Sequence, residues 1–135
     1  MLLTIGTIPF HWARDEIFGF YEKLADLPVD LVYLGETTCP NRQELSFDDW
    51  LTIGKELQNS GKQVVLSTLP LNDSRDAIAL TRRICDQQDL GVEANDMAAV
   101  ELLSQNTRPF SIGPSVNIYN AASLDLLVRL GAQHW

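Results

Sequence analysis

Hydrophobic and polar positions follow two different spacings along the chain. Short apolar runs rich in β-branched residues alternate with longer segments whose apolar residues recur every three or four positions. In the first long segment, Ile17, Tyr21 and Leu24 would share one helix face. We expect strands at 2–8, 30–34, 63–68, 90–93 and 110–112, and helices at 13–26, 46–60, 73–88, 95–105 and 121–130.

Five strand–helix units in succession predict an α/β fold with a parallel sheet. The run 63–68 is continuously apolar toward its centre, so we expect it to be buried on both faces. One architecture that fits is a partial TIM-like (β/α) barrel, since a whole barrel takes about 250 residues. The alternative is a small doubly wound sheet, complete at this length.

The last four residues, 132–135, resemble the start of a sixth strand that is cut off. A complete domain rarely stops at such a point, which favours the barrel. We therefore expect residues 1–135 to be the N-terminal part of a single barrel-like domain.

Charge and composition limit the classes of partner. The formal net charge is −8 and 45% of the residues are hydrophobic, which is typical of a folded domain with an acidic surface. Such a surface repels nucleic-acid phosphates and anionic membranes. No apolar run is long enough for a membrane helix, and no signal-peptide pattern precedes the first strand. We expect a cytoplasmic protein that neither binds nucleic acid nor inserts into a membrane.

Polar side chains gather after the predicted strands, where parallel α/β folds keep their chemistry. Glu36 and Glu93 are the acid–base candidates, although each could equally be a solvated carboxylate. Arg42 could bind an anion, but a surface ion pair is the commoner role. Asn117, Tyr119 and Asn120 are candidate substrate-binding residues after the fifth strand. Asn95, Asp96 and Asn120 would also serve as helix caps.

The two cysteines fall in different surroundings. Cys39 follows the second strand in the loop 35–45, whereas Cys85 lies on an apolar helical stripe and is expected in the core. Taken alone, Cys39 is more often a small apolar loop residue than a site. His11 is expected on the surface, and no histidine is spaced to activate Cys39. The sequence contains no dinucleotide fingerprint, phosphate loop, G-x-S-x-G elbow or H-E-x-x-H motif.

Four segments, taken in order, resemble one known family. They are VYLGETTC with a following arginine, GKQVVLSTL, VEAND, and an N-x-YNA segment. Together they are similar to the UbiV-type (YhbV) branch of the collagenase-like peptidase family, and the likeness spans all 135 residues. Each motif is weak by itself, and their order and spacing carry the resemblance.

The resemblance implies a barrel-like domain in a chain about twice as long. It also implies an accessory role in oxygen-independent ubiquinone biosynthesis, at a ring hydroxylation, in a heterodimer with a UbiU-type (YhbU) partner subunit. In this branch a [4Fe–4S] cluster is held by four cysteines, and Cys39 matches the first of them. Cys85 matches none, so we expect no cluster in this chain alone.

Three functions therefore stay open at the level of sequence. The first is the UbiV-type accessory role, with Cys39 as a metal ligand and Glu36, Glu93, Asn117 and Tyr119 around the mouth of the barrel. The second is a collagenase-like peptidase, and the third is a non-catalytic α/β binding module. Whether the protein is an enzyme is left undecided. An incomplete barrel would also have unpaired strand edges, so we expect either self-association or marginal stability.

Overall fold

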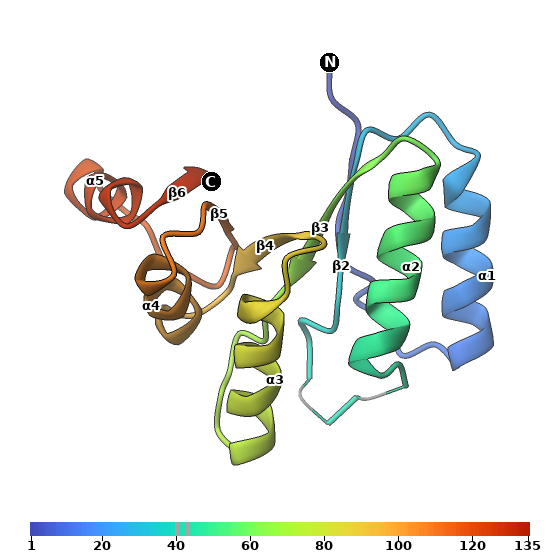
Figure 1. Cartoon of the computed structure of the whole chain (residues 1–135), viewed down its shortest axis with the longest axis horizontal. Helices are drawn as coiled ribbons and strands as arrows, with labels where there is room; N and C mark the ends of the chain where they lie inside the picture. The colour runs from blue at the N-terminus through green and yellow to red at the C-terminus, as the bar shows by residue number, and fades with distance from the viewer. Residues whose placement is uncertain (40, 43) are drawn as a thin grey trace.

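The computed structural model describes residues 1–39, 41–42 and 44–135, and it contains a six-stranded parallel sheet with five helices (Figure 1). In chain order the elements are β1 (Thr4–Ile5), α1 (Arg14–Ala25), β2 (Leu31–Leu34), α2 (Phe47–Asn59), β3 (Gln63–Ser67), α3 (Arg75–Asp86), β4 (Gly91–Ala94), α4 (Met97–Gln105), β5 (Phe110–Ile112), α5 (Ala121–Arg129) and β6 (Ala132–His134). The predicted α/β class and strand–helix alternation are confirmed.

Each strand pairs with the next one in the chain, giving the order β1-β2-β3-β4-β5-β6. A doubly wound sheet requires a point at which the strand order reverses, and none occurs among the strands of the described residues. Right-handed connections between sequential parallel strands place every helix on the same side. Figure 1 accordingly shows the helices as an outer arc around the strands, which is the arrangement of a barrel segment.

The helix-facing side of the sheet forms the core. Val32 and Leu34 of β2 are fully buried, and Leu66 and Val92 on the neighbouring strands are 1% exposed. These residues alternate along their strands with residues of the opposite side, as the pleat requires. Each helix covers them with its own apolar stripe, for example Ile53 and Leu57 of α2.

The opposite, concave side of the sheet is only partly covered. Tyr33 of β2 pairs with Val65 of β3, and both side chains are partly exposed. Gln63 is exposed. The expectation that 63–68 is buried on both faces is therefore met only at the carboxyl end of the strand, where Ser67 is 1% exposed, and is wrong at Gln63 and Val65.

The first strand is shorter than predicted, covering Thr4–Ile5 rather than 2–8. It pairs with β2 alone, so few of its backbone groups gain sheet partners. Leu2 and Leu3 stay 68% and 46% exposed. The apolar pattern therefore predicted too long a strand, because strand formation also depends on pairing with a neighbouring strand. Within the described ranges, no helix combines the length and the apolar character needed to cross a membrane.

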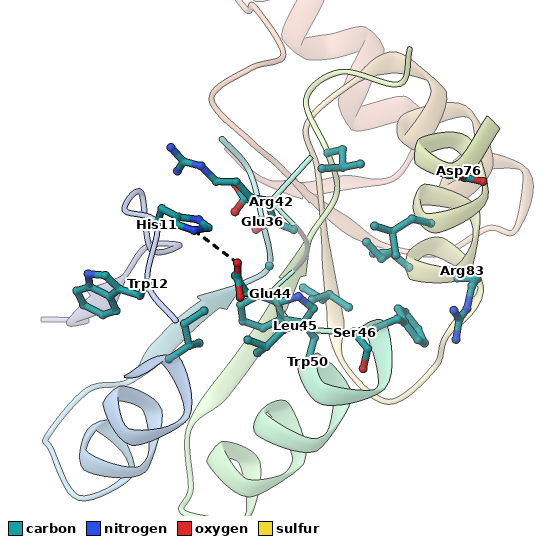
Figure 2. Close-up of a pocket in the computed structure, with 18 of the residues that line it drawn as sticks. His11, Trp12, Glu36, Arg42, Glu44, Leu45, Ser46, Trp50, Asp76 and Arg83 are labelled. Atoms are coloured by element: carbon teal, nitrogen blue, oxygen red, sulfur yellow. Dashed lines mark ion pairs between the residues drawn. The ribbon is translucent and has the colours of Figure 1, made fainter. Parts of the chain in front are cut away.

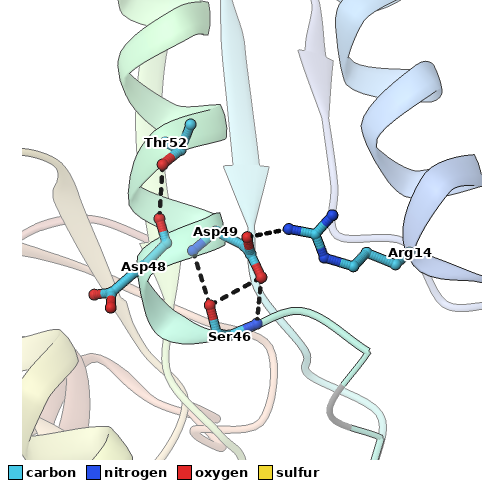
Figure 3. A network of polar contacts seen from close by, with 5 residues as sticks. All are labelled: Arg14, Ser46, Asp48, Asp49 and Thr52. Atoms are coloured by element: carbon cyan, nitrogen blue, oxygen red, sulfur yellow. Dashed lines mark hydrogen bonds and ion pairs between the residues drawn. The ribbon is translucent and has the colours of Figure 1, made fainter.

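The N-terminus of α2 has the predicted capping box (Figure 3). The Ser46 hydroxyl accepts a hydrogen bond from the Asp49 backbone N–H at 3.1 Å, and the Ser46 N–H donates to the Asp49 carboxylate at 2.9 Å. Arg14 of α1 donates to the other carboxylate oxygen at 2.5 Å. The cap therefore ends the Cys39 loop, begins α2 and ties α2 to α1.

We expect Ser46→Ala to lower the free energy of unfolding by about 1 kcal/mol, because an N-cap hydroxyl is lost. Chemical denaturation monitored by circular dichroism measures this change. Ser115→Ala is the matched control, since Ser115 is exposed and lies outside any helix. Equal stability of the Ser46 and Ser115 variants would contradict the role given to the cap.

The same cap makes stability depend on pH. Hydrogen bonds from Ser46, first its backbone N–H and then its hydroxyl, lower the pKa of Asp49. The stabilisation is therefore complete above the unfolded carboxyl pKa, about 3.9, and is lost as pH falls through the lower folded-state pKa. We expect Asp49→Asn to flatten the acid side of the stability–pH curve. An unchanged acid slope in that variant would show that Asp49 does not contribute.

Candidate functional site at the carboxyl ends of the strands

The sheet topology brings the sequence-predicted polar residues to one edge. Glu36 and Cys39 follow β2, Thr68 follows β3, and Glu93 lies near the end of β4. All six strands are parallel, so their carboxyl ends share this edge. Within the edge, the residues form two separate groups around the Cys39 loop and around Glu93.

The Cys39 loop is held by the Glu36 side chain. One carboxylate oxygen of Glu36 accepts hydrogen bonds from the backbone N–H of Thr38 at 2.6 Å and of Cys39 at 3.0 Å. The Cys39 carbonyl in turn accepts from the Arg42 N–H at 3.0 Å. Glu36 therefore has a defined structural role, which is to fix the backbone at a partly exposed cysteine.

Gly35 allows the chain to leave β2 in this direction. Its φ is +113°, a region that side chains other than glycine rarely adopt. A Cβ at this position would also lie 2.9 Å from the Ser67 carbonyl oxygen of β3. A glycine before Glu36 is therefore required for the loop to begin close to the neighbouring strand.

A first cavity of about 370 Å³ lies beside this loop, between α2 and α3 (Figure 2). Its wall is mostly apolar and aromatic and includes Trp50 and Leu80, with Glu36 on the loop side. The imidazole of His11 points toward Glu44 at its edge, with 3.5 Å between the nitrogen and the oxygen. Both side chains are substantially exposed, so this pair contributes little to stability.

Glu93 belongs to a hydrogen-bonded group between β3 and β4. The Asn95 side-chain amide donates to the Glu93 carboxylate at 3.0 Å and to the Thr68 carbonyl at 3.2 Å. The Asn95 backbone N–H donates to the Thr68 hydroxyl at 2.9 Å. Asn95 is 2% exposed, so this group is a buried connection and not a helix cap. Asp96 alone caps α4.

A second cavity, of about 540 Å³, opens on the concave side of the sheet next to Glu93. Tyr33 of β2 and Gly113, which follows β5, also line it. A Cβ on Gly113 would lie 2.1 Å from the Asn95 amide oxygen and 2.9 Å from the Glu93 carboxyl carbon. Burial, and then the negative charge of Glu93, raise the pKa of Tyr33.

The substrate-binding candidates Asn117, Tyr119 and Asn120 are not among the described residues that line either cavity, whereas Arg42 lines the first. Asn117 and Tyr119 are exposed, and the Tyr119 hydroxyl donates to the Asn117 side chain at 3.3 Å. Asn120 caps α5 by accepting from the Ser123 N–H at 2.9 Å. Arg42 donates to the Pro9 carbonyl at 3.3 Å instead of pairing with Glu36. Substrate binding by Asn117, Tyr119 and Asn120 stays a prediction.

The residues of this chain do not fit a whole [4Fe–4S] cluster, which needs four thiolates. The sequence has two cysteines. Cys85 is fully buried in α3, where burial raises the pKa of its thiol to about 12, so it is a poor ligand. In the part of the chain that the structure describes, no three His, Cys, Asp or Glu side chains are grouped to hold a metal ion.

Two residues at this edge were not predicted from the sequence. Tyr33 alternates with the buried Val32 and Leu34, a spacing that places it on the other side of the strand and could have identified it. Gly113 carries no comparable signal, because its need for glycine arises from Asn95, which follows the neighbouring strand β4. Neither a protein-family model nor a solved structure matches the chain.

We expect a thiol reagent such as iodoacetamide to modify Cys39 in the native protein and to leave Cys85 unmodified. Cys39 is partly exposed, whereas Cys85 has no exposed surface and a raised thiol pKa. Peptide mass spectrometry measures both sites, and denatured protein gives the fully reactive reference. Equal modification of the two cysteines under native conditions would contradict the assigned burial.

We expect Gly113→Ala to destabilise the fold by about 1–3 kcal/mol, because the new methyl group must displace the Asn95 amide and the Glu93 carboxyl group. Gly6→Ala is the matched control, since nothing lies within 4 Å of a Cβ at that position. Denaturation midpoints distinguish the two variants. Similar stability would show that Asn95 and Glu93 are not packed against Gly113.

Proposed function

We propose that this chain is part of a UbiV-type accessory protein for oxygen-independent ubiquinone biosynthesis, acting at a ring hydroxylation together with a UbiU-type partner subunit. In this proposal Cys39 is the one thiolate that residues 1–135 contribute to a [4Fe–4S] cluster. The remaining ligands would come from residues outside this sequence. The four ordered motifs motivate the proposal, and the barrel-type strand order agrees with the fold that they imply.

The observation that carries the proposal is the hydrogen bonding of the Cys39 loop. Glu36 accepts from the Cys39 N–H and from the Thr38 N–H, and these contacts fix the backbone of a partly exposed thiol at the carboxyl edge of the sheet. Hydrogen bonds that hold a ligating residue in position are typical of metal sites. A cysteine serving only as a small apolar residue would need neither access nor a fixed backbone.

The contacts of Cys39 do not favour the peptidase alternative. A cysteine nucleophile needs a base within hydrogen-bond reach. Of the two histidines, His11 pairs with Glu44 and His134 lies on β6. The described contacts pair neither histidine with Cys39, so we propose the accessory role ahead of the peptidase.

The test is the iron content of the full natural protein, produced without oxygen together with its partner subunit. We expect about four irons per chain in the unchanged protein and a loss of most of that iron in Cys39→Ala. Thr38→Ala is the control, because it changes an exposed neighbour in the same loop and should keep the iron. Unchanged iron in Cys39→Ala, or absence of iron from the unchanged protein, would overturn the proposal.

A further inference from the structure

The second cavity has an uncompensated negative charge. Glu93 is the only acidic residue among those lining it, and the described lining contains no lysine, arginine or histidine. Partial burial of a carboxylate without a cation is unfavourable, and a positively charged ligand would relieve that cost. The negative charge of the cavity therefore favours a positively charged ligand.

The carboxylate is also held in place before any ligand arrives. One oxygen of Glu93 accepts from the Asn95 amide, and Asn95 is anchored through its side chain and its backbone to Thr68. Thr68 completes the group by donating its N–H to the Glu93 carbonyl at 2.9 Å. The Asn95 amide donates to one carboxylate oxygen of Glu93 and so fixes the orientation of that side chain. Such pre-organisation reduces the entropy lost on binding.

The shape and lining of the cavity favour an organic cation over a metal ion. Hard divalent cations take six or more oxygen ligands and favour carboxylates, whereas Glu93 is the only side-chain carboxylate among the described residues that line this cavity. Its volume of about 540 Å³ lies in the range of small-molecule sites. The lining includes two aromatic side chains, Tyr33 and Trp135, and aromatic rings attract organic ammonium groups.

We propose that the concave cavity binds a small organic ammonium compound, with the Glu93 carboxylate as the anion that pairs with it and Asn95 as the residue that positions Glu93. This inference goes beyond the proposed function, because it involves neither Cys39 nor a metal cluster. Gly113 has a direct part in the site, since a side chain there would occupy the space of the Asn95 amide and the Glu93 carboxyl group.

The test uses benzylammonium as the probe and nuclear magnetic resonance of the full natural protein as the readout. Benzyl alcohol and benzoate are the neutral and anionic comparison compounds of similar size. We expect saturable shifts with benzylammonium at the backbone amides of Gly113, Ser115 and Thr37, which line the cavity. Saturable binding of benzyl alcohol or benzoate with equal affinity would overturn the proposal, as would no saturable shift at all.

Two carboxylate variants assign the binding to Glu93. Glu93→Gln should weaken benzylammonium binding by about tenfold or more, because a charge-assisted hydrogen bond is lost. Glu22→Gln removes the same charge from the exposed surface of α1 and should leave binding unchanged. Equal weakening of benzylammonium binding in both variants would show that only the net charge of the protein matters, and would overturn the proposed site. If Glu93→Gln does not fold, the residues that shift in the unchanged protein on addition of benzylammonium provide the test. Shifts confined to residues outside the cavity would overturn the proposal.

Discussion

The burial of one side of the parallel sheet beneath helices is the constraint on which the other features depend. Val32, Leu34 and Leu66 face the helices and are almost completely buried. Within the described residues, sequential right-handed connections put the helices α1 to α5 on that side and leave the opposite side without a helix. The concave side can therefore carry Tyr33 and Glu93, which would be costly in a fully covered sheet.

Backbone hydrogen bonds and close approaches then shape the carboxyl edge. Gly35 lets the chain turn beside β3, and Glu36 fixes the loop that follows by accepting two backbone N–H groups. Gly113 leaves room for the Asn95 amide in the same way at the second cavity. Glu36 and Glu93 thus have different roles at the same edge of the sheet, since Glu36 orders a loop beside the first cavity and Glu93 is held by Asn95 beside the second.

Local patterns predicted the elements and part of the site. The apolar spacing of helices such as 13–26 was informative because their buried residues, Ile17, Tyr21 and Leu24, pack on a single side. The position of Cys85 in the core followed from the same spacing. The Ser46–Asp49 cap was visible because all of its atoms come from four consecutive residues.

Features that depend on distant segments could not be predicted in this way. The length of β1 depends on pairing with β2, and the role of Asn95 depends on Thr68, 27 residues earlier. The first cavity depends on how α2 and α3 are spaced, which no local pattern specifies. Segment 63–68 was predicted to be buried on both faces for the same reason, because its composition does not reveal which side of the sheet the helices leave open.

The one-sided covering of the sheet can be tested on two adjacent residues. Val64 faces the helices and is 4% exposed, whereas Val65 faces the concave side and is partly exposed. Methyl resonances recorded with a neutral paramagnetic probe in the solvent compare them directly. The account predicts strong broadening of the Val65 methyl signals and little broadening of those of Val64. Equal protection of both residues would contradict it, because the concave side would then be covered as well.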